Sequence, residues 1–273
     1  MESLPGVCLR YTALVFHGAY LRKTELLHTR TEGCSDAFAT ASNITQSIAF
    51  PLQRAGVQVL TFFDTVATCA AADARLVQLL EPSAHAFSPC QRPRPVDSYI
   101  EVLKMVLTWR AHRIDAVVLL RFDVKYRTSL DALPIDWTKL NFAFPDGPVY
   151  WAKERKVSDL FHVLPAAFVP LLIKALDHSP ASRPGAHFVY LPLAKSLGQS
   201  RLRFIDAHGR GSNLAADDPE PRSFLFIDRG CSGLSASCPS ATWNNMTCDL
   251  SMTSRARPRG QRHKRQGRGA GTL

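Results

Sequence analysis

The sequence predicts an α/β fold with a mostly parallel central sheet, helices on both faces and an irregular C-terminal part. Three observations predict it. The 273 residues, 46% of them apolar, are enough to bury a substantial core. Short apolar runs alternate with helical patterns along the first two thirds of the chain. The run Ala116–Leu120 is unbroken, which is typical of a strand buried on both faces in the middle of a parallel sheet.

The order of these segments is β-α-β-α-β-α-β, which indicates parallel strands joined by right-handed crossovers. Gly56 ends the first helix, and Pro51 kinks or restarts it. Ser98 and Glu101 have the spacing of a capping box that opens a later helix. The expected strands are Tyr11–Phe16, Val57–Phe63, Ala84–Ser88, Ala116–Phe122, Leu140–Phe144, Phe188–Leu191, Arg203–Ile205 and Phe224–Ile227; the expected helices are Ser42–Ala55, Ala71–Leu80, Ser98–Arg110 and Pro165–Leu176.

Charge is distributed unevenly along the chain. The net charge is +10, but seven of the positive side chains lie in the last residues, where no acidic residue occurs. We therefore expect residues 1–250 to form a single α/β domain that is only mildly basic. Residues 251–273 should be a disordered, Arg/Gly-rich tail with weak affinity for polyanions. The seven tail charges are Arg255, Arg257, Arg259, Arg262, Lys264, Arg265 and Arg268.

The N-terminal segment MESLPGVCLRYTALVFHGAY predicts a first strand and not a signal peptide, because no basic region precedes its apolar run. No window reaches the length of a transmembrane helix. The seven cysteines include no C-x-x-C pair, which argues against a structural zinc site. These features predict no particular cellular compartment.

Charged residues follow the apolar runs, where open α/β sheets bind ligands. The chain has no P-loop, no G-x-G-x-x-G, no G-x-S-x-G and no H-E-x-x-H motif. Instead, Asp64, Asp123 and Asp159 follow apolar segments, and cations accompany them at Arg22, Arg121 and Lys125. Such a set predicts a diphosphate site, since Mg²⁺ or Mn²⁺ is held by one or two carboxylates together with phosphates. A structural ion pair at the strand end is the alternative.

Four segments resemble glycosyltransferase-like proteins with a nucleotide-diphospho-sugar transferase (GT-A-like) fold. They are YTALVFHGAYLR, ASNITQSIAFPLQRAGVQVLTFFDT, DAVVLLRFDVKYR and KVSDLFHVLP. The resemblance covers about residues 10–176 and is one of layout, with few invariant letters. It implies a Rossmann-like GT-A architecture, a nucleotide-sugar donor and a carbohydrate or glycoconjugate acceptor. It also implies the Golgi or secretory lumen, although the start of this sequence predicts neither a signal peptide nor an anchor.

The resemblance assigns roles to individual residues. Gly18, Tyr20 and Arg22 would lie near the nucleotide, and Asp159 would lie on the acceptor side. His162 is a candidate general base, although a lone histidine in an apolar setting is more often a packed core residue.

Asp123 takes the place of the metal-binding carboxylate, which implies Mn²⁺ or Mg²⁺. Many such enzymes have D-x-D at this point, whereas here Arg121 stands two positions before Asp123. Arg121 and Lys125 would then lie near the donor diphosphate and neutralise it with or without a cation.

The leading functional hypothesis is sugar transfer from a nucleotide-sugar donor to an acceptor. The alternative is a non-catalytic protein of the same fold that binds a ligand or partner. A nucleic-acid-binding function would depend on the basic tail alone.

Overall fold

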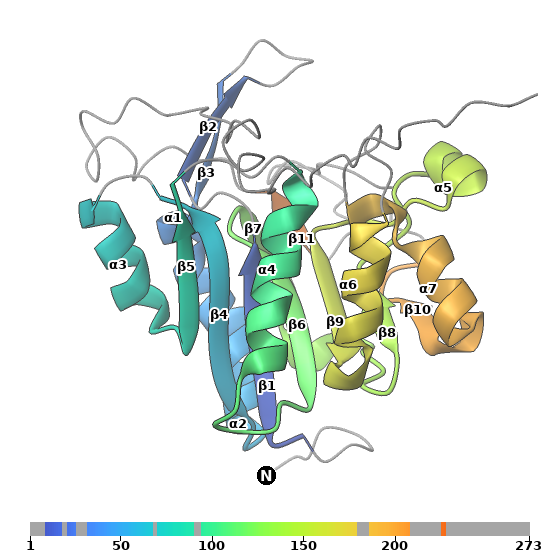
Figure 1. Cartoon of the computed structure of the whole chain (residues 1–273), viewed down its shortest axis with the longest axis horizontal. Coiled ribbons are helices and arrows are strands. Elements are labelled where there is room, and N and C mark those ends of the chain that lie inside the picture. Colours follow the sequence, from blue (N-terminus) through green and yellow to red (C-terminus); the bar gives the residue numbers. More distant parts are fainter. Residues whose placement is uncertain are drawn as a thin grey trace, which may run out of the picture.

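The computed structural model describes residues 9–17, 21–25, 32–67, 70–89, 94–178, 186–207 and 225–227. Its centre is a seven-stranded sheet with the strand order β10-β8-β9-β6-β1-β4-β5 (Figure 1). The α/β class is confirmed. The strands of the sheet are β1 Tyr11–His17, β4 Gln58–Val66, β5 Ala84–Ser88, β6 Ala116–Arg121, β8 Leu140–Phe142, β9 Phe161–Pro165 and β10 Leu202–Phe204.

Strand β6 lies in the interior of the sheet, as its unbroken apolar run predicts. It pairs with β1 in parallel, and β1 pairs with β4 in the same direction. Every residue from Ala116 to Leu120 is fully buried. Side chains of alternating residues enter two separate apolar clusters, one on each face of the sheet. A strand buried on both faces needs apolar residues at every position, which explains the absence of polar alternation.

Strand β9 runs antiparallel to both of its neighbours, β6 and β8. The sequence predicts neither this strand nor its direction, because it treats Val157–Leu164 only as the lead into a helix. The sheet is therefore mostly parallel with one reversed strand. This reversal places the start of β9 at the same edge of the sheet as the end of β6.

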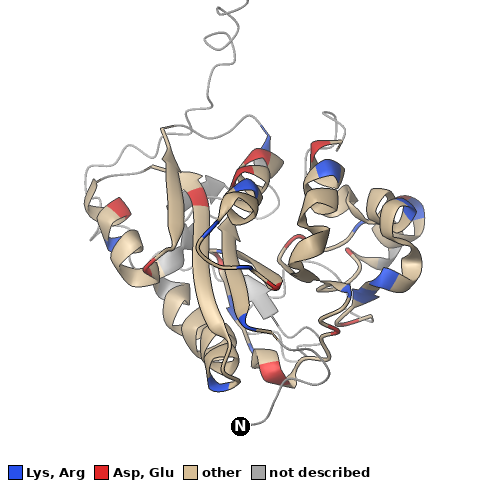
Figure 2. Cartoon of the chain, turned by 60° about the horizontal axis from the view of Figure 1, so that its bottom comes forward, with Lys and Arg blue, Asp and Glu red and all other residues tan. Residues whose placement is uncertain are grey.

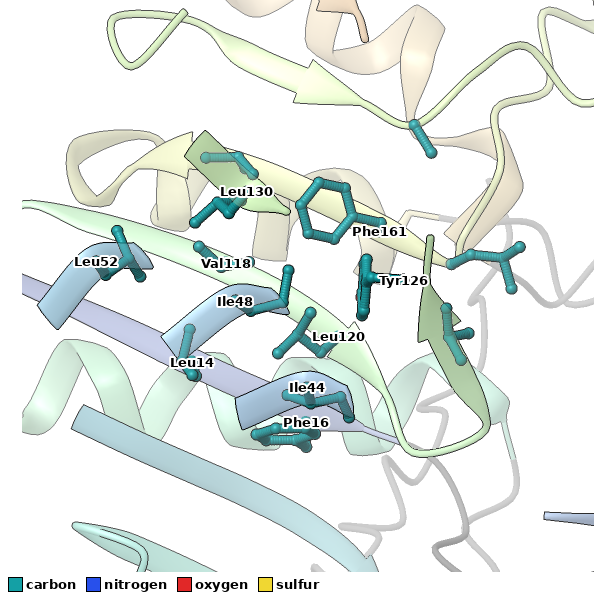
Figure 3. Packing of buried hydrophobic residues seen from close by; sticks show 14 of the residues in the cluster. Leu14, Phe16, Ile44, Ile48, Leu52, Val118, Leu120, Tyr126, Leu130 and Phe161 are labelled. Atoms are coloured by element: carbon teal, nitrogen blue, oxygen red, sulfur yellow. The ribbon is translucent and has the colours of Figure 1, made fainter. Parts of the chain in front are cut away.

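Helices cover both faces of the sheet (Figure 1). One face carries α4 Pro95–Thr108, α6 Val169–Asp177 and α7 Tyr190–Leu197. The other carries α1 Ala37–Ile44, a π-helical turn Thr45–Ala49, α2 Phe50–Arg54 and α3 Ala70–Leu80. Figure 3 shows Ile44, Ile48 and Leu52 of this second layer over Leu14, Phe16, Val118 and Leu120 of the sheet. The expected helical spacing of these three residues is thus confirmed.

Two further helix boundaries differ from the prediction. The first helix begins at Ala37, before Ser42, and its π-helical turn comes directly before α2, whose first turn contains Pro51. Proline cannot donate a backbone hydrogen bond, and the wider π turn accommodates that lost bond without ending the helix. Gly56 follows with φ of 80°, a conformation that favours glycine and ends the helix.

Helix α4 begins at Pro95, so the capping box at Ser98 and Glu101 was wrong. Arg94 is the N-cap residue, and its backbone N–H donates to Asp97 Oδ2 at 3.1 Å. Ser98 Oγ instead donates to the carbonyl of Asp64 at 2.7 Å, which attaches α4 to the sheet. A proline in the first turn and an acidic residue at the third position favour the earlier start.

The chain after β9 forms a short 3₁₀ turn Ala166–Phe168 and then α6, so Pro170 lies in the first turn of that helix. The strand expected at Phe188–Leu191 was wrong, because Ala186–Phe188 is a 3₁₀ turn and α7 follows it. The short strands expected near Arg203 and Phe226 are β10 and β11 Leu225–Ile227, and β11 pairs with β7 Val124–Tyr126.

Four smaller elements complete the described fold: a hairpin of β2 Leu21–Glu25 with β3 Glu32–Asp36, two 3₁₀ turns at Leu130–Ala132 and Gln199–Arg201, and α5 Pro148–Glu154. The predicted tail at residues 251–273 lies outside the described residues. No helix within the described ranges is long and apolar enough to span a membrane.

Candidate functional site

Three segments of the chain meet at the carboxyl edge of the two central strands. His17 is the last residue of β1 and lies opposite Arg121, the last residue of β6. Asp159 precedes β9 by two residues, and the reversed direction of β9 brings it to this edge. Ligands of open α/β sheets bind at this kind of edge. Figure 2 shows that charged residues are sparse along the central strands, so a charged group at their ends is distinctive.

Arg121 is held between two carboxylates. Its Nε and Nη2 donate to Asp123 Oδ1 and Oδ2 at 2.9 and 2.8 Å, a bidentate pair. Its Nη1 donates to Asp159 Oδ1 at 3.3 Å. The Asp123 side chain is only 7% exposed, whereas those of Arg121 and Asp159 are 24% and 20% exposed. Asp123 therefore lies beneath the guanidinium, and Arg121 and Asp159 reach the surface.

His187 extends this cluster from a segment that the sequence analysis did not single out. Its Nε2 lies 3.6 Å from Asp159 Oδ2, and its Nδ1 lies 3.5 Å from Asp146 Oδ2. Asp146 belongs to a Pro-Asp-Gly segment that predicts only a turn. No apolar strand pattern precedes His187, so neither residue carries a sequence signal for a site. We call Arg121, Asp123, Asp146, Asp159 and His187 the edge cluster.

Buried polar side chains lie close to the edge cluster, on the α4 face of the sheet. His17 contacts Tyr99 of α4 with a ring-centroid distance of 3.6 Å, and His162 packs edge-on against Phe142 at 5.2 Å. His17 Nε2, Tyr99 Oη and both ring nitrogens of His162 are buried and form no hydrogen bond to another described residue. Buried polar atoms are normally paired, so this group marks an unusual part of the core.

The charges of the cluster set the protonation of its members. Burial alone would raise the pKa of Asp159, but Arg121 and the neighbouring histidines hold that pKa well below its usual range. Burial, together with the charge of Arg121, lowers the pKa of His17 well below its usual value. Burial lowers the pKa of His162 to about 4, although Asp159 opposes this shift. Near neutral pH, Asp159 is thus ionised and His17 and His162 are neutral.

The structure therefore brings together Arg121, Asp123, Asp159 and His162 of the predicted site residues. Lys125 lies two residues beyond Asp123 in β7, opposite Phe226. Arg22 lies in β2 opposite Ser35, and its side chain is outside the described part. Gly18 and Tyr20 lie outside the described residues.

The edge cluster does not have the geometry of a Mn²⁺ or Mg²⁺ site. Both oxygens of Asp123 accept hydrogen bonds from the Arg121 guanidinium, which places a positive charge where the cation would bind. Within the part of the chain that the structure describes, no group of three or more His, Cys, Asp or Glu side chains is arranged to hold a metal ion.

Comparison with known proteins finds solved structures that are similar to this chain. A solved structure of the nucleoside-diphosphate-sugar pyrophosphorylase from Vibrio cholerae RC9 is similar with a TM-score of 0.42 and 12% sequence identity. The match covers 73% of this chain and 93% of that one. No protein-family model matches the chain, and no curated protein matches it.

Proposed function

We propose that this chain is a glycosyltransferase-like enzyme that moves a sugar from a nucleotide-sugar donor to a carbohydrate or glycoconjugate acceptor. One observation carries the proposal: Arg121 is held by Asp123 and Asp159 at the carboxyl edge of the central strands, where α/β sheets bind ligands. A strongly shifted pKa beside a specific charge partner supports a functional site there. The resemblance of the strand-end segments to GT-A-like proteins supports the choice of substrate.

The charge of the edge cluster indicates which part of the donor it faces. Asp123 and Asp159 more than neutralise the one positive charge of Arg121, so a diphosphate gains little by approaching this pair. Sugar hydroxyls suit it better, because an ionised carboxylate accepts hydrogen bonds strongly and the guanidinium retains further N–H donors. We assign Asp159 and the remaining N–H groups of Arg121 to the sugar hydroxyls, with Asp123 fixing the guanidinium from beneath. We assign the donor diphosphate to Lys125 and Arg22.

A thermal-shift series with nucleotide sugars tests this assignment. UDP-glucose, UDP-galactose, UDP-N-acetylglucosamine, GDP-mannose and GDP-fucose form the panel. A bound donor at 100 times its Kd stabilises the folded state by about 2.7 kcal/mol, which raises the Tm of a domain of this size by roughly 5–10 °C. Asp159→Asn should remove the shift. Asp131→Asn is the matched control, because Asp131 pairs with Arg54 on the exposed surface. Absence of a shift with every member of the panel would contradict the proposal.

Metal dependence is tested in an activity assay that measures release of nucleoside diphosphate from the donor. If Asp123 holds a cation, Asp123→Asn abolishes transfer and Mn²⁺ raises the activity of the wild type. If no metal cation is needed, a chelator leaves activity unchanged, and Arg121→Ala, which removes the common partner of Asp123 and Asp159, reduces activity more than Asp123→Asn does. Loss of one group that stabilises the transition state lowers kcat by a factor that corresponds to about 3 kcal/mol. The bidentate Arg121–Asp123 pair favours the second outcome.

A specific observation favours a second candidate, a binding protein without activity. Of the two predicted catalytic residues, Asp159 is a weak base because its pKa is depressed, and His162 is only 1% exposed. A protein that shifts in Tm with a donor but releases no nucleoside diphosphate would have this second function.

A further inference from the structure

His187 has the fixed orientation that a general base requires. It lies in the 3₁₀ turn Ala186–Phe188, and its Nδ1 is 2.9 Å from the carbonyl oxygen of Val157. The backbone N–H of Val157 donates in return to the carbonyl of His187 at 2.9 Å. A carbonyl only accepts hydrogen bonds, so Nδ1 carries a proton, and in the neutral form of the ring it is Nε2 that presents the lone pair.

The lone pair of Nε2 lies across a gap from Asp159 Oδ2. The two atoms are 3.6 Å apart, which is too long for a direct hydrogen bond. An oxygen atom about 2.8 Å from each of them forms a bridging triangle of ordinary hydrogen bonds. Neutral Nε2 and ionised Asp159 both only accept, so the bridging group must donate twice. Water meets this requirement, and so does a pair of adjacent hydroxyls on a sugar.

His187 also differs from the two predicted catalytic residues in access to solvent. Its side chain is 35% exposed, so a proton taken up at Nε2 can pass to water. His162 is sealed in the core, and Asp159 is held ionised by Arg121. Within the edge cluster, His187 thus combines a free lone pair, a fixed ring and a route for the proton.

We infer that His187 is the general base of the sugar transfer, an inference that rests on the proposed function. One acceptor hydroxyl donates to Nε2 while the adjacent hydroxyl of the same sugar donates to Asp159, or a single water donates to both. As the oxygen that donates to Nε2 attacks the anomeric carbon of the donor, its proton moves to Nε2. The bond between that carbon and the diphosphate oxygen breaks, and its electron pair leaves on the nucleoside diphosphate. His187 then releases the proton to solvent.

Donor hydrolysis tests the inference without knowledge of the acceptor, because water has the two donors that the gap requires. Nucleoside diphosphate release is measured for the donor that gives the largest thermal shift. His187→Gln should lower kcat by about 10²–10⁴-fold and leave the donor-induced shift unchanged. His178→Gln is the matched control, because His178 Nδ1 lies 2.7 Å from the Lys174 carbonyl on the exposed end of α6. Added imidazole should restore part of the activity of His187→Ala.

Every other outcome overturns either this inference or the proposed function. Activity of His187→Gln within about threefold of the wild type overturns the inference. So does a loss of activity that follows a lost thermal shift, or that imidazole does not restore in a folded His187→Ala protein, since a structural role explains both. Donor binding by the wild type without any diphosphate release also overturns it and leaves the binding function standing. Absence of donor binding refutes the proposed function itself.

Discussion

Arg121 and Asp159 are separated by 38 positions in the sequence, yet Nη1 of Arg121 lies 3.3 Å from Asp159 Oδ1. The reversed direction of β9 is the cause. If β9 were parallel to β6, Asp159 would lie at the opposite edge of the sheet, about the length of a strand away. The ion pair therefore joins the end of one central strand to the start of its neighbour, and Asp123 fixes the guanidinium from beneath.

The first prediction concerns the stability of this arrangement. Arg121→Ala leaves the buried carboxylate of Asp123 without its bidentate partner, which should lower the free energy of unfolding by about 2–4 kcal/mol. Arg54→Ala removes an exposed pair with Asp131 and should lower it by less than about 1 kcal/mol. Urea titration measures both values. Equal effects of the two variants would mean that Arg121 does not stabilise the sheet edge.

The second prediction concerns acid. The pKa of Asp159 is depressed in the folded state, so below about pH 4 the unfolded chain binds a proton there that the folded protein does not. Stability present above that pH is thus lost as the pH falls toward the folded pKa. Asp159→Asn lacks this contribution, and its free energy of unfolding should fall less steeply with acid than that of the wild type. Parallel pH profiles in urea titrations would contradict the prediction.

The third prediction concerns His162, whose depressed pKa acts over a higher pH range. Between about pH 6.5 and pH 4 the unfolded chain binds a proton that the folded protein excludes. The free energy of unfolding therefore decreases as the pH is lowered through this window. The full loss is on the order of 3 kcal/mol. His162→Leu should be less sensitive to pH in this window. Near pH 7 it should lie within about 1 kcal/mol of the wild type, because it removes two buried nitrogens without partners. Steep destabilisation near pH 7 would reveal a hidden partner of the ring.

The sequence predicts the strands well because apolar runs reflect burial directly. Val117 and Leu119 enter one core and Val118 the other, so the apolar run itself identifies β6 as an interior strand. The direction of β9 was missed because a short apolar run has no information about which neighbour it pairs with or in which sense. The start of α4 was missed because an arginine is not among the residues that usually cap a helix.

The candidate site likewise contains residues that the sequence predicts and residues that only the fold brings to the site. Arg121 and Asp123 could be placed at the sheet edge because they directly follow the apolar run of β6. Asp159 was a candidate from the sequence, but its position beside Arg121 depends on the direction of β9, which was not predicted. His187 could not be predicted, since it reaches the cluster through a contact with Val157 that spans 30 positions. Asp146 has an adequate local explanation as a turn residue, and only the fold places it near His187.

The fourth prediction concerns Asn43, which attaches α1 to β7. Its Nδ2 donates to the carbonyl of Tyr126 at 2.9 Å, and its Oδ1 accepts from the Tyr126 N–H at 2.6 Å. Asn43→Ala removes both bonds from a partly buried backbone and should lower the free energy of unfolding by about 1–3 kcal/mol. Ser42→Ala, at a neighbouring exposed position, should change it by less than about 0.5 kcal/mol. Urea titration compares the two variants.

The same contact bears on modification, because Asn43-Ile44-Thr45 is a sequon for N-glycosylation. A glycan on Nδ2 would replace one of its N–H groups and place a bulky sugar against β7, where the amide is packed against Tyr126. Folded protein from a secretory host should therefore carry no glycan at this position, which mass spectrometry of the tryptic peptides can establish. Full occupancy at Asn43 with unchanged stability in urea would show that the amide does not hold α1 to β7.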